Sequence, residues 1–408
     1  MKRLLLVCCV ALQMLSVYAD ELDDLFAVED DFSGSESESE SEGTEESEPN
    51  VGSGSDSYVD LDALGTRDPK FTGRVKLEGG LLYGLDDWPG RDAAADTEIA
   101  DLYSGTIFYE MATRFSLDVR PASHIRFFGS ATIELNTDRM VFAPYSIGEL
   151  FVDYTLAETW FFRVGKQRMT WGQGRLLGNP GNVVSGIDDG VAVRGFVPLG
   201  PNGITAAVFA RGSDFKDTSN PDHREFTYAA LYDTTIRNIT VGSSLRYRHA
   251  DDVRPLHAAA YVKTSVGPLD VSLEGVRHFD PHNFGHEAYQ WIVSNVFWEF
   301  GDPLWRVIAE YQFGDTDTAQ TTGQQSAVAV RAPRVLGWTP AVQWKHSYTE
   351  TAGEIVAGID RSLAAHLRTS IGIPITYGSP DSYYRTASDV PGNRVAAVIL
   401  RLGVTLNY

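Results

Sequence analysis

Cysteine is scarce in this 408-residue chain, and long apolar runs are missing altogether. Both cysteines lie within the first nine residues, so the remainder of the chain cannot form an internal disulfide. No run of about 18 apolar residues occurs, which is the length that a membrane-spanning helix needs. No convincing long amphipathic helix is present either. These absences exclude a helical membrane protein and a small secreted protein held together by disulfides.

Residues 1–19 are predicted to form a secretory signal peptide. Lys2 and Arg3 provide its charged start, residues 4–17 form a mostly apolar stretch, and small residues precede a cleavage site before Asp20. A lipoprotein with an acylated cysteine is the alternative, although the apolar stretch before the two cysteines is very short. Signal removal would leave an exported chain without cysteine, which fits a barrel because its hydrogen-bond ladder closes on itself.

Lysine and arginine are absent between Asp20 and Asp62, where 17 residues are acidic. The chain from residue 63 onward holds 32 basic and 38 acidic residues, so most of the net charge of −21 belongs to this acidic segment. Its Ser/Glu-rich composition cannot bury enough apolar surface to offset the entropy of ordering. We therefore predict that residues 20–66 are a disordered periplasmic segment. A solvated spacer, a weak site for divalent cations and a tether are its alternative roles.

One part of the acidic segment is different. Apolar residues of Glu21–Val28 fall near one face at helical spacing. This short stretch is either a peptide that docks on a periplasmic partner or a nascent turn that binds nothing.

Period-two alternation recurs along residues 67–408. Because successive side chains of a strand point to opposite faces, each segment has one apolar and one polar face. The strands run to about 10–13 residues, which exceeds the usual five or six and suits a tilted membrane span. The clearest segments are 127–135, 149–156, 237–248, 305–313 and 367–377.

Short and long connections alternate between these segments, as they do in outer-membrane barrels with short turns on the periplasmic side. We place about 18 strands between Phe71 and Tyr408, and this even count would put both ends on the periplasmic side. Counts of 14 or 16 stay open because segments 189–197, 325–333 and 353–360 are weakly patterned. The short connections fall near 121–122, 157–158, 200–203, 267–268, 301–303 and 362–364, and the long ones at 85–103, 174–187, 212–224, 280–286, 314–324 and 378–392.

The predicted fold class is all-β, a transmembrane antiparallel β-barrel over residues 67–408. A soluble sandwich or jelly roll would also show alternation. Strand length argues against a soluble fold, and so does the clustering of aromatic residues near strand ends, where an interface girdle would lie. The aromatic residues assigned to this girdle are Tyr83, Tyr154, Trp160, Trp171, Trp298, Trp305, Trp338, Tyr377 and Tyr408.

Charged residues on the polar faces must point into the barrel, because a charge on the lipid face costs about 2–4 kcal/mol near the membrane midplane. A cylinder of about 18 strands is too wide for its own side chains to fill, so we expect a water-filled pore narrowed by loops. Each charge either takes part in solute selection or pairs to hold the barrel's shape. The residues predicted to line the lumen are Arg126, Glu134, Glu149, Asp153, Arg163, Arg246, Arg248, Lys263, Glu274, Arg306, Glu310, Lys345, Arg368 and Arg401.

The last eight residues alternate between apolar and polar and finish on an aromatic residue. They resemble the C-terminal assembly signal of outer-membrane barrels, through Arg401, Gly403, Leu406 and Tyr408. The resemblance implies recognition by the barrel-assembly machinery. The same stretch is predicted to be the closing strand, which pairs with the first strand near Phe71 and leaves no free edge.

The stretch Phe162–Arg175, followed by Asn179-Pro180-Gly181-Asn182, resembles a motif of several outer-membrane porin families, including 18-stranded channels of the alginate-export type. These families carry Arg-x-Gly-[Lys/Arg]-Gln on a strand, then an aromatic-Gly step and Asn-Pro. The resemblance implies a passive channel with structural roles for Gln167 and Trp171. It also suggests that loop 173–188 folds inward as a constriction. Alternation slips near Gly165, which a bulge or an exit from the membrane would explain.

Signatures of catalysis are not found. The chain has no Gly-x-Ser-x-Gly and no His-Glu-x-x-His, so no enzyme, cofactor or metal site is predicted. Acidity and the lack of a basic patch exclude nucleic acid as a partner.

These observations predict a porin-like channel for passive diffusion of small hydrophilic solutes, in the outer membrane of a diderm bacterium. A surface-exposed barrel whose loops bind ligands, as an adhesin does, is the main alternative. A channel for hydrophobic substrates is the third, although it would want an apolar lumen and an N-terminal plug.

Overall fold

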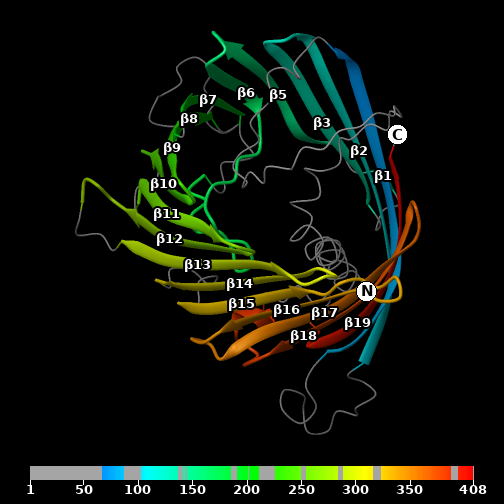
Figure 1. Cartoon of the computed structure of the whole chain (residues 1–408). Helices are drawn as coiled ribbons and strands as arrows, with labels where there is room; N and C mark the ends of the chain where they lie inside the picture. Colours follow the sequence, from blue (N-terminus) through cyan, green and yellow to red (C-terminus); the bar gives the residue numbers. More distant parts are fainter. Residues whose placement is uncertain are drawn as a thin grey trace.

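Antiparallel strands form one closed ring (Figure 1). The computed structural model describes residues 67–86, 103–136, 141–142, 145–184, 191–200, 202–210, 226–249, 254–283, 288–315, 323–386 and 394–407. The predicted signal peptide, the acidic segment and Tyr408 lie outside these residues. Among the described helices, none is long and apolar enough to cross a membrane.

Eighteen strands of the described chain make up the ring, each paired with its neighbour in sequence. The two-residue strand β4 pairs only with the end of β3. The strands are β1 (Arg67–Leu85), β2 (Tyr103–Ala122), β3 (Ile125–Asn136), β4 (Val141–Phe142), β5 (Ser146–Leu156), β6 (Trp160–Lys166), β7 (Val191–Leu199), β8 (Asn202–Ala210), β9 (Thr227–Ile236), β10 (Ile239–Arg248), β11 (Leu256–Val266), β12 (Leu269–Phe279), β13 (Tyr289–Phe300), β14 (Trp305–Gly314), β15 (Gln324–Arg331), β16 (Thr339–Ser347), β17 (Ala352–Ala364), β18 (Leu367–Tyr377) and β19 (Ala396–Asn407), and a short helix α2 (Tyr383–Thr386) precedes β19.

The first and last strands close the ring. Arg74 on β1 lies opposite Asn407 on β19, and Leu85 lies opposite Ala396 at the other end of the same ladder. The pairing removes both sheet edges, as a barrel in lipid requires. The predicted count of about 18 strands is confirmed, and the weakly patterned segments correspond to β7, β15 and β17.

Most short connections lie at one rim of the barrel, the short-turn rim, and most long connections lie at the other, the long-loop rim. The short turns after β5, β7, β11 and β13 lie where the sequence predicts them, whereas the turn after β2 is at 123–124, just beyond the predicted 121–122. The predicted turn at 362–364 is wrong by a few residues, because an irregularity in the ladder at Ser362/Ala364 lets β17 continue to Ala364. Two further links break the rhythm, since 332–338 is long on the short-turn rim and 348–351 is short on the opposite rim.

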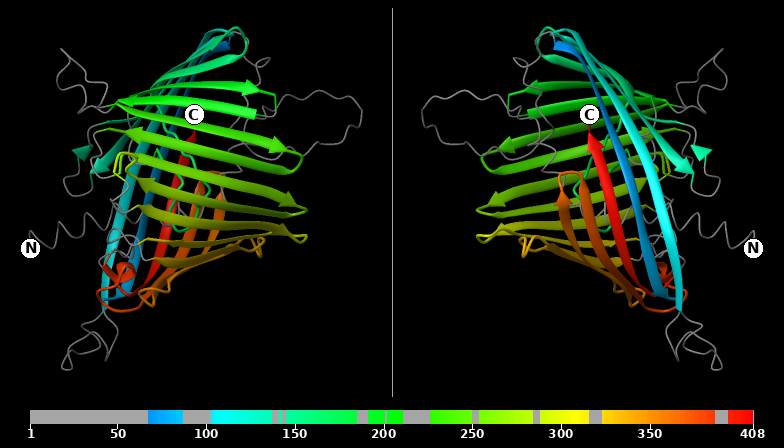
Figure 2. Two further views of the ribbon diagram at one scale, coloured as in Figure 1. Left: turned by 90° about the vertical axis from the view of Figure 1, so that its left-hand side faces the viewer. Right: turned by 90° about the vertical axis from the view of Figure 1, so that its right-hand side faces the viewer.

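The two faces of the wall differ as the alternation predicts. Directly opposed residues of neighbouring strands share a face. The outward face leaves large apolar side chains in the open, such as Ile107, which is 75% exposed, and Leu245 and Leu273, each 49% exposed. In water this surface would be costly, whereas lipid would cover it. The closed ring, the apolar exterior and the charged interior are those of a transmembrane β-barrel. Figure 2 shows β1, β2 and β19 running steeply across the direction of β9–β14.

Candidate functional site: the barrel interior

Strand β6 stops early, and the chain turns into the barrel after Lys166 (Figure 1). We call residues 167–184 the inward segment. Alternate residues Gln167, Met169 and Trp171 are 1%, 3% and 6% exposed. The Gln167 side chain donates a hydrogen bond to the carbonyl oxygen of Ala192 at 3.2 Å. The slip in alternation near Gly165 therefore marks an exit from the wall, and the placement of Trp171 in an interface girdle is wrong, because its ring packs inside the barrel.

The inward segment is closed on itself by the residues of the sequence motif. The backbone N–H of Trp171 donates to the Asn182 side-chain oxygen at 3.0 Å, and the Asn179 amide donates to the Trp171 carbonyl at 2.8 Å. Gly172 and Gly178 have φ of 89° and 112°, values that favour glycine. The aromatic-Gly and Asn-Pro elements are thus the two sides of a tight internal loop.

Two buried carboxylates on the far wall hold this loop. Glu310 on β14 accepts backbone hydrogen bonds from Arg175 at 2.5 Å, from Leu176 at 3.0 Å and from Leu177 at 3.2 Å. Glu274 on β12 accepts one from the backbone N–H of Gln173 at 3.0 Å. Hydrogen bonds to ionised groups are the stronger class, so these contacts fix the loop against the wall.

Neighbouring amides complete the attachment. The Gln312 side chain donates to Glu310 and to the carbonyl oxygen of Gly178, both at 2.8 Å. Gly181 lies directly on Glu274, whose carboxylate a Cβ at that position would overlap. Sequence alternation identified Glu274 and Glu310 as inward-facing, but it held no signal for the partner segment more than 100 residues away.

Apolar packing spreads the inward segment over half of the lumen wall. Leu176 packs with Phe297, Ile308, Ala327 and Ala329 of β13–β15. Met169, Trp171, Val183 and Val184 pack with apolar side chains of β7–β9, β11 and β12. The prediction that this loop folds inward is therefore confirmed for residues 173–184. Residues 185–188 lie outside the described chain.

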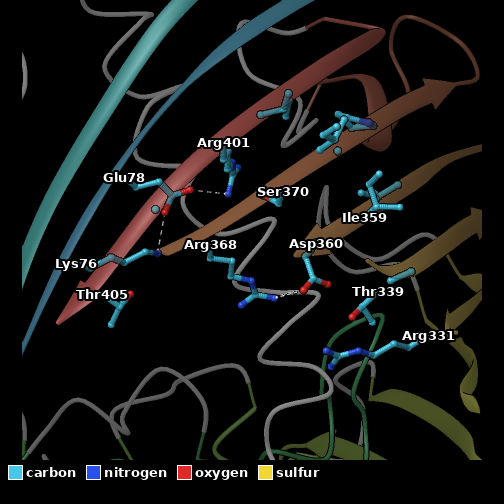
Figure 3. A pocket seen from close by; sticks show the side chains of 18 residues that line it. Lys76, Glu78, Arg331, Thr339, Ile359, Asp360, Arg368, Ser370, Arg401 and Thr405 are labelled. Atoms are coloured by element: carbon cyan, nitrogen blue, oxygen red, sulfur yellow. Dashed lines mark ion pairs between the residues drawn. The ribbon is translucent and has the colours of Figure 1, made fainter. Parts of the chain in front are cut away.

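The wall on the other side carries a pocket of about 150 Å³ (Figure 3). It is lined by β1 and β15–β19, next to the strands that the inward segment covers. Glu78 lies between two cations, Lys76 at 3.1 Å and Arg401 at 3.5 Å. Arg368 pairs with Asp360 at 3.1 Å. Charges that the chain separates by more than 300 residues meet here because β19 closes on β1.

A second charge cluster runs across β2, β3, β5 and β6 near the short-turn rim. Arg126 lies 2.9 Å from Asp118 and 3.5 Å from Asp153, which in turn lies 2.6 Å from Arg163. The Arg163 guanidinium also covers the ring of Phe151, 3.8 Å from its centroid. Asp118 also lies 3.5 Å from Arg120, so each of the two carboxylates is shared by two arginines in a lattice of alternating charges.

The register places all fourteen predicted lumen residues on the inward face. Their surroundings differ. Arg246 lies 3.3 Å from His257, Arg306 pairs with Glu299 at 2.7 Å, and Glu149 accepts the backbone N–H of Arg168 at 3.3 Å. Glu134 is exposed, whereas Arg248, Lys263 and Lys345 are half-buried, and Lys345 lies opposite Glu354. Whether any of them selects solutes stays a prediction.

Several inward-facing charges were missed by the sequence reading. On β1, Lys76-Leu77-Glu78 does alternate, but Gly79-Gly80 and an inward Leu82 interrupt the pattern. Asp360 lies in a weakly patterned segment. The charged residues of this kind that take part in the two clusters are Lys76, Glu78, Asp118, Arg120, Arg331 and Asp360.

Comparison with known proteins finds similarity to solved structures. No family model matches the chain, and no curated protein matches it. OccK9 (OpdG) of Pseudomonas aeruginosa aligns with a TM-score of 0.48 at 9% identity over 83% of this chain and 98% of its own. OccK8 (OprE) of the same organism gives 0.47 at 10% identity over 83% and 98%. A loop-deletion mutant of OmpT, an outer membrane protein of Vibrio cholerae, gives 0.42 at 10% identity over 84% and 99%.

Proposed function

We propose that this protein is a passive channel for small hydrophilic solutes in the outer membrane of a diderm bacterium. The proposal rests on one observation: the inward segment covers one part of the lumen wall and leaves the other part uncovered. The inward segment packs against β7–β9 and β11–β15, whereas the wall from the end of β15 through β19 to β1 keeps a charged pocket. An 18-stranded cylinder is too wide to be filled by its own side chains, so an eccentric, water-filled path past the segment is its physical default.

The fixed position of the inward segment supports a constriction. Its backbone is tied to Glu274 and Glu310, and its apolar side chains are buried against the wall. A loop held in this way narrows the lumen without closing it. Opposed acidic and basic groups on the remaining wall would then act on every solute that passes.

The charged lumen argues against a channel for hydrophobic substrates. The inward faces carry Arg126, Asp153 and Arg163 on one side and Glu78 and Arg401 on another. An apolar solute would gain little free energy by moving from water into such charged surroundings. A role of the loops as an adhesin would depend on connections that lie mostly outside the described residues.

Reconstitution into planar lipid bilayers tests the channel directly. We expect stepwise, ohmic currents in KCl, and swelling of protein-containing liposomes in small sugars that falls off with sugar size. Folded barrel should be verified by its heat-modifiable mobility in gel electrophoresis. A folded barrel that is silent in bilayers and does not swell liposomes would contradict the proposal and favour a ligand-binding surface barrel.

We also propose that the N-terminus of the exported protein is produced by cleavage of the signal peptide. We expect export to remove residues 1–19, so that the membrane protein begins at Asp20 with its acidic segment in the periplasm. N-terminal sequencing of protein purified from outer membranes checks this, and protection of the segment from protease in intact cells checks its side. An N-terminus at either cysteine, with attached lipid, would instead support the lipoprotein.

A further inference from the structure

Glycine forms the floor of the pocket on β16–β19. Gly358 on β17 lies opposite Gly372 on β18, and Gly403 on β19 lies opposite Arg368. A Cβ at Gly372 would have no atom within 4 Å, so it would point into open space. Missing side chains at these positions therefore create the hollow, and nothing in the wall requires glycine for packing at Gly372.

The pocket has an apolar end and a charged end. Val356 lies opposite Pro374, one step toward the long-loop rim from the glycine floor, and Ile399 lies beside Gly372. Toward the short-turn rim the next rows carry Asp360 and then Arg368. A solute lying along the barrel axis would thus meet apolar surface at one end and charge at the other.

Cations outnumber carboxylates around this pocket. Four basic and two acidic side chains line it, an excess of two positive charges. Glu78 and Arg401 are deep, with side chains 8% and 5% exposed. Arg368 is 44% exposed and Asp360 is 19% exposed, so this pair faces the lumen (Figure 3).

We propose that the pocket binds a small organic acid by ion-pair exchange. The solute's carboxylate takes the place of Asp360 beside the Arg368 guanidinium, and its short apolar body lies over Gly358 and Gly372 against Val356. No covalent bond changes. This proposal rests on the proposed channel, since the solute reaches the pocket through an open lumen.

Exchange of one carboxylate for another explains how such a site could stay weak enough for transport. Arg368 keeps an acceptor throughout, so the guanidinium is never left without a counter-ion. Because the Arg368 side chain is 44% exposed, water screens its pair with Asp360, so a solute carboxylate can displace Asp360, which is then left to the water of the lumen. Weak, reversible binding is what conduction requires.

The test is block of single-channel KCl current by butyrate, with butyramide as the neutral analogue of the same size. Dilute KCl is used because salt screens these charges. We expect butyrate to reduce the current at lower concentrations than butyramide, acetate or inorganic phosphate. Acetate lacks the apolar body, and phosphate reports attraction of anions in general. Equal block by all three anions would overturn the organic-acid assignment.

Two substitutions should act in opposite directions. Asp360→Asn removes the competing carboxylate and should lower the half-blocking concentration of butyrate, whereas Arg368→Gln should raise it, each by about threefold or more. Gly372→Val fills the floor and should raise it for butyrate more than for acetate. Heat-modifiable mobility in gel electrophoresis and stepwise current in KCl show in each case that the barrel has folded and is open, and block is compared as the fraction of each variant's own current.

Arg126→Gln is the matched control, since Arg126 is an inward-facing arginine in the other charge cluster. It should leave butyrate block unchanged. Block that is lost in Arg126→Gln as well, or that is the same in the parent, Asp360→Asn and Arg368→Gln, overturns the proposal while leaving the channel intact. Absence of current in the parent contradicts the channel itself.

Discussion

The Glu310 carboxylate accepts a hydrogen bond from the backbone N–H of Arg175, 135 positions earlier in the chain. The same carboxylate receives the next two backbone N–H groups, of Leu176 and Leu177. Three successive N–H groups converge on one anion, an arrangement that favours negative charge. The wall of the barrel therefore sets the conformation of the inward segment, and the segment in turn shapes the pore.

Glu310→Gln should loosen the inward segment. Glutamine keeps the shape but removes the charge, and its NH₂ group cannot accept the backbone donors. A loss of about 2 kcal/mol would raise the undocked fraction of the segment about 30-fold. We expect flickering single-channel currents with a higher mean conductance, measured in planar bilayers.

Glu299→Gln is the control for this substitution. Glu299 is an inward carboxylate on the adjacent strand, but it pairs with Arg306 at 2.7 Å. Its variant should keep quiet channels. Equal current noise in the two variants would show that the carboxylate contacts with the segment do not restrain it.

Removal of the internal loop should widen the pore. Trp171 and Asn182 are hydrogen-bonded at 3.0 Å, so replacing residues 172–181 with two glycines leaves the flanking chain close to its present path. We expect larger unitary conductance and a higher size limit for sugars in liposome swelling. Unchanged conductance in a barrel that still folds would show that the loop does not form the constriction.

Period-two alternation predicted the barrel and failed where the inward segment lies. On β15 the inward residues Ala327 and Ala329 pack against Leu176, while the outward residues Val328 and Val330 are apolar as well. Both faces are then apolar, so alternation disappears. Ala192 on β7 packs against the same segment and weakens the pattern there. The weak patterns of β7 and β15 are thus a consequence of the folded loop, whereas β17 lies on the wall that the loop does not cover.

The sequence predicted which charged side chains of the candidate site point into the barrel, but not which of them contact one another. Alternation put Arg401 inward, yet its partner Glu78 is known only once the ring has closed, because the two belong to the last and first strands. The loop motif indicated structural roles for Gln167 and Trp171. It could not indicate that the carboxylates of Glu274 and Glu310 would accept hydrogen bonds from the loop. Which residues of β12 and β14 face the loop depends on how all the strands between them are paired, and local sequence does not determine this.

Loss of Asp153 should destabilise the charge lattice near the short-turn rim. Asp153→Asn leaves Arg126 and Arg163 without the carboxylate they share at 3.5 and 2.6 Å. Because these side chains are about a quarter exposed, we expect a loss of only about 1 kcal/mol in unfolding by urea. A double-mutant cycle with Arg163→Gln should show coupling. Additive effects would mean that the pair does not contribute to stability.

The closing seam between β1 and β19 offers a matched pair of neighbouring glycines. A Cβ at Gly80 would overlap the carbonyl oxygen of Leu400 and lie 2.7 Å from the Phe108 ring, whereas a Cβ at Gly79 would make ordinary contacts, the nearest at 3.5 Å. Gly80→Ala should therefore push the last strand away from the first and cost about 1–3 kcal/mol, as overpacking does.

Because strain at this seam affects ring closure, the effect should be seen in assembly as well as in stability. We expect Gly80→Ala to fold more slowly into lipid vesicles and to lose heat-modifiable mobility at a lower temperature than Gly79→Ala, which should match the parent. Both variants add one methyl group to the same strand, so general strand propensity cannot separate them. Equal behaviour would mean that β1 and β19 can part locally at Gly80 without weakening the barrel.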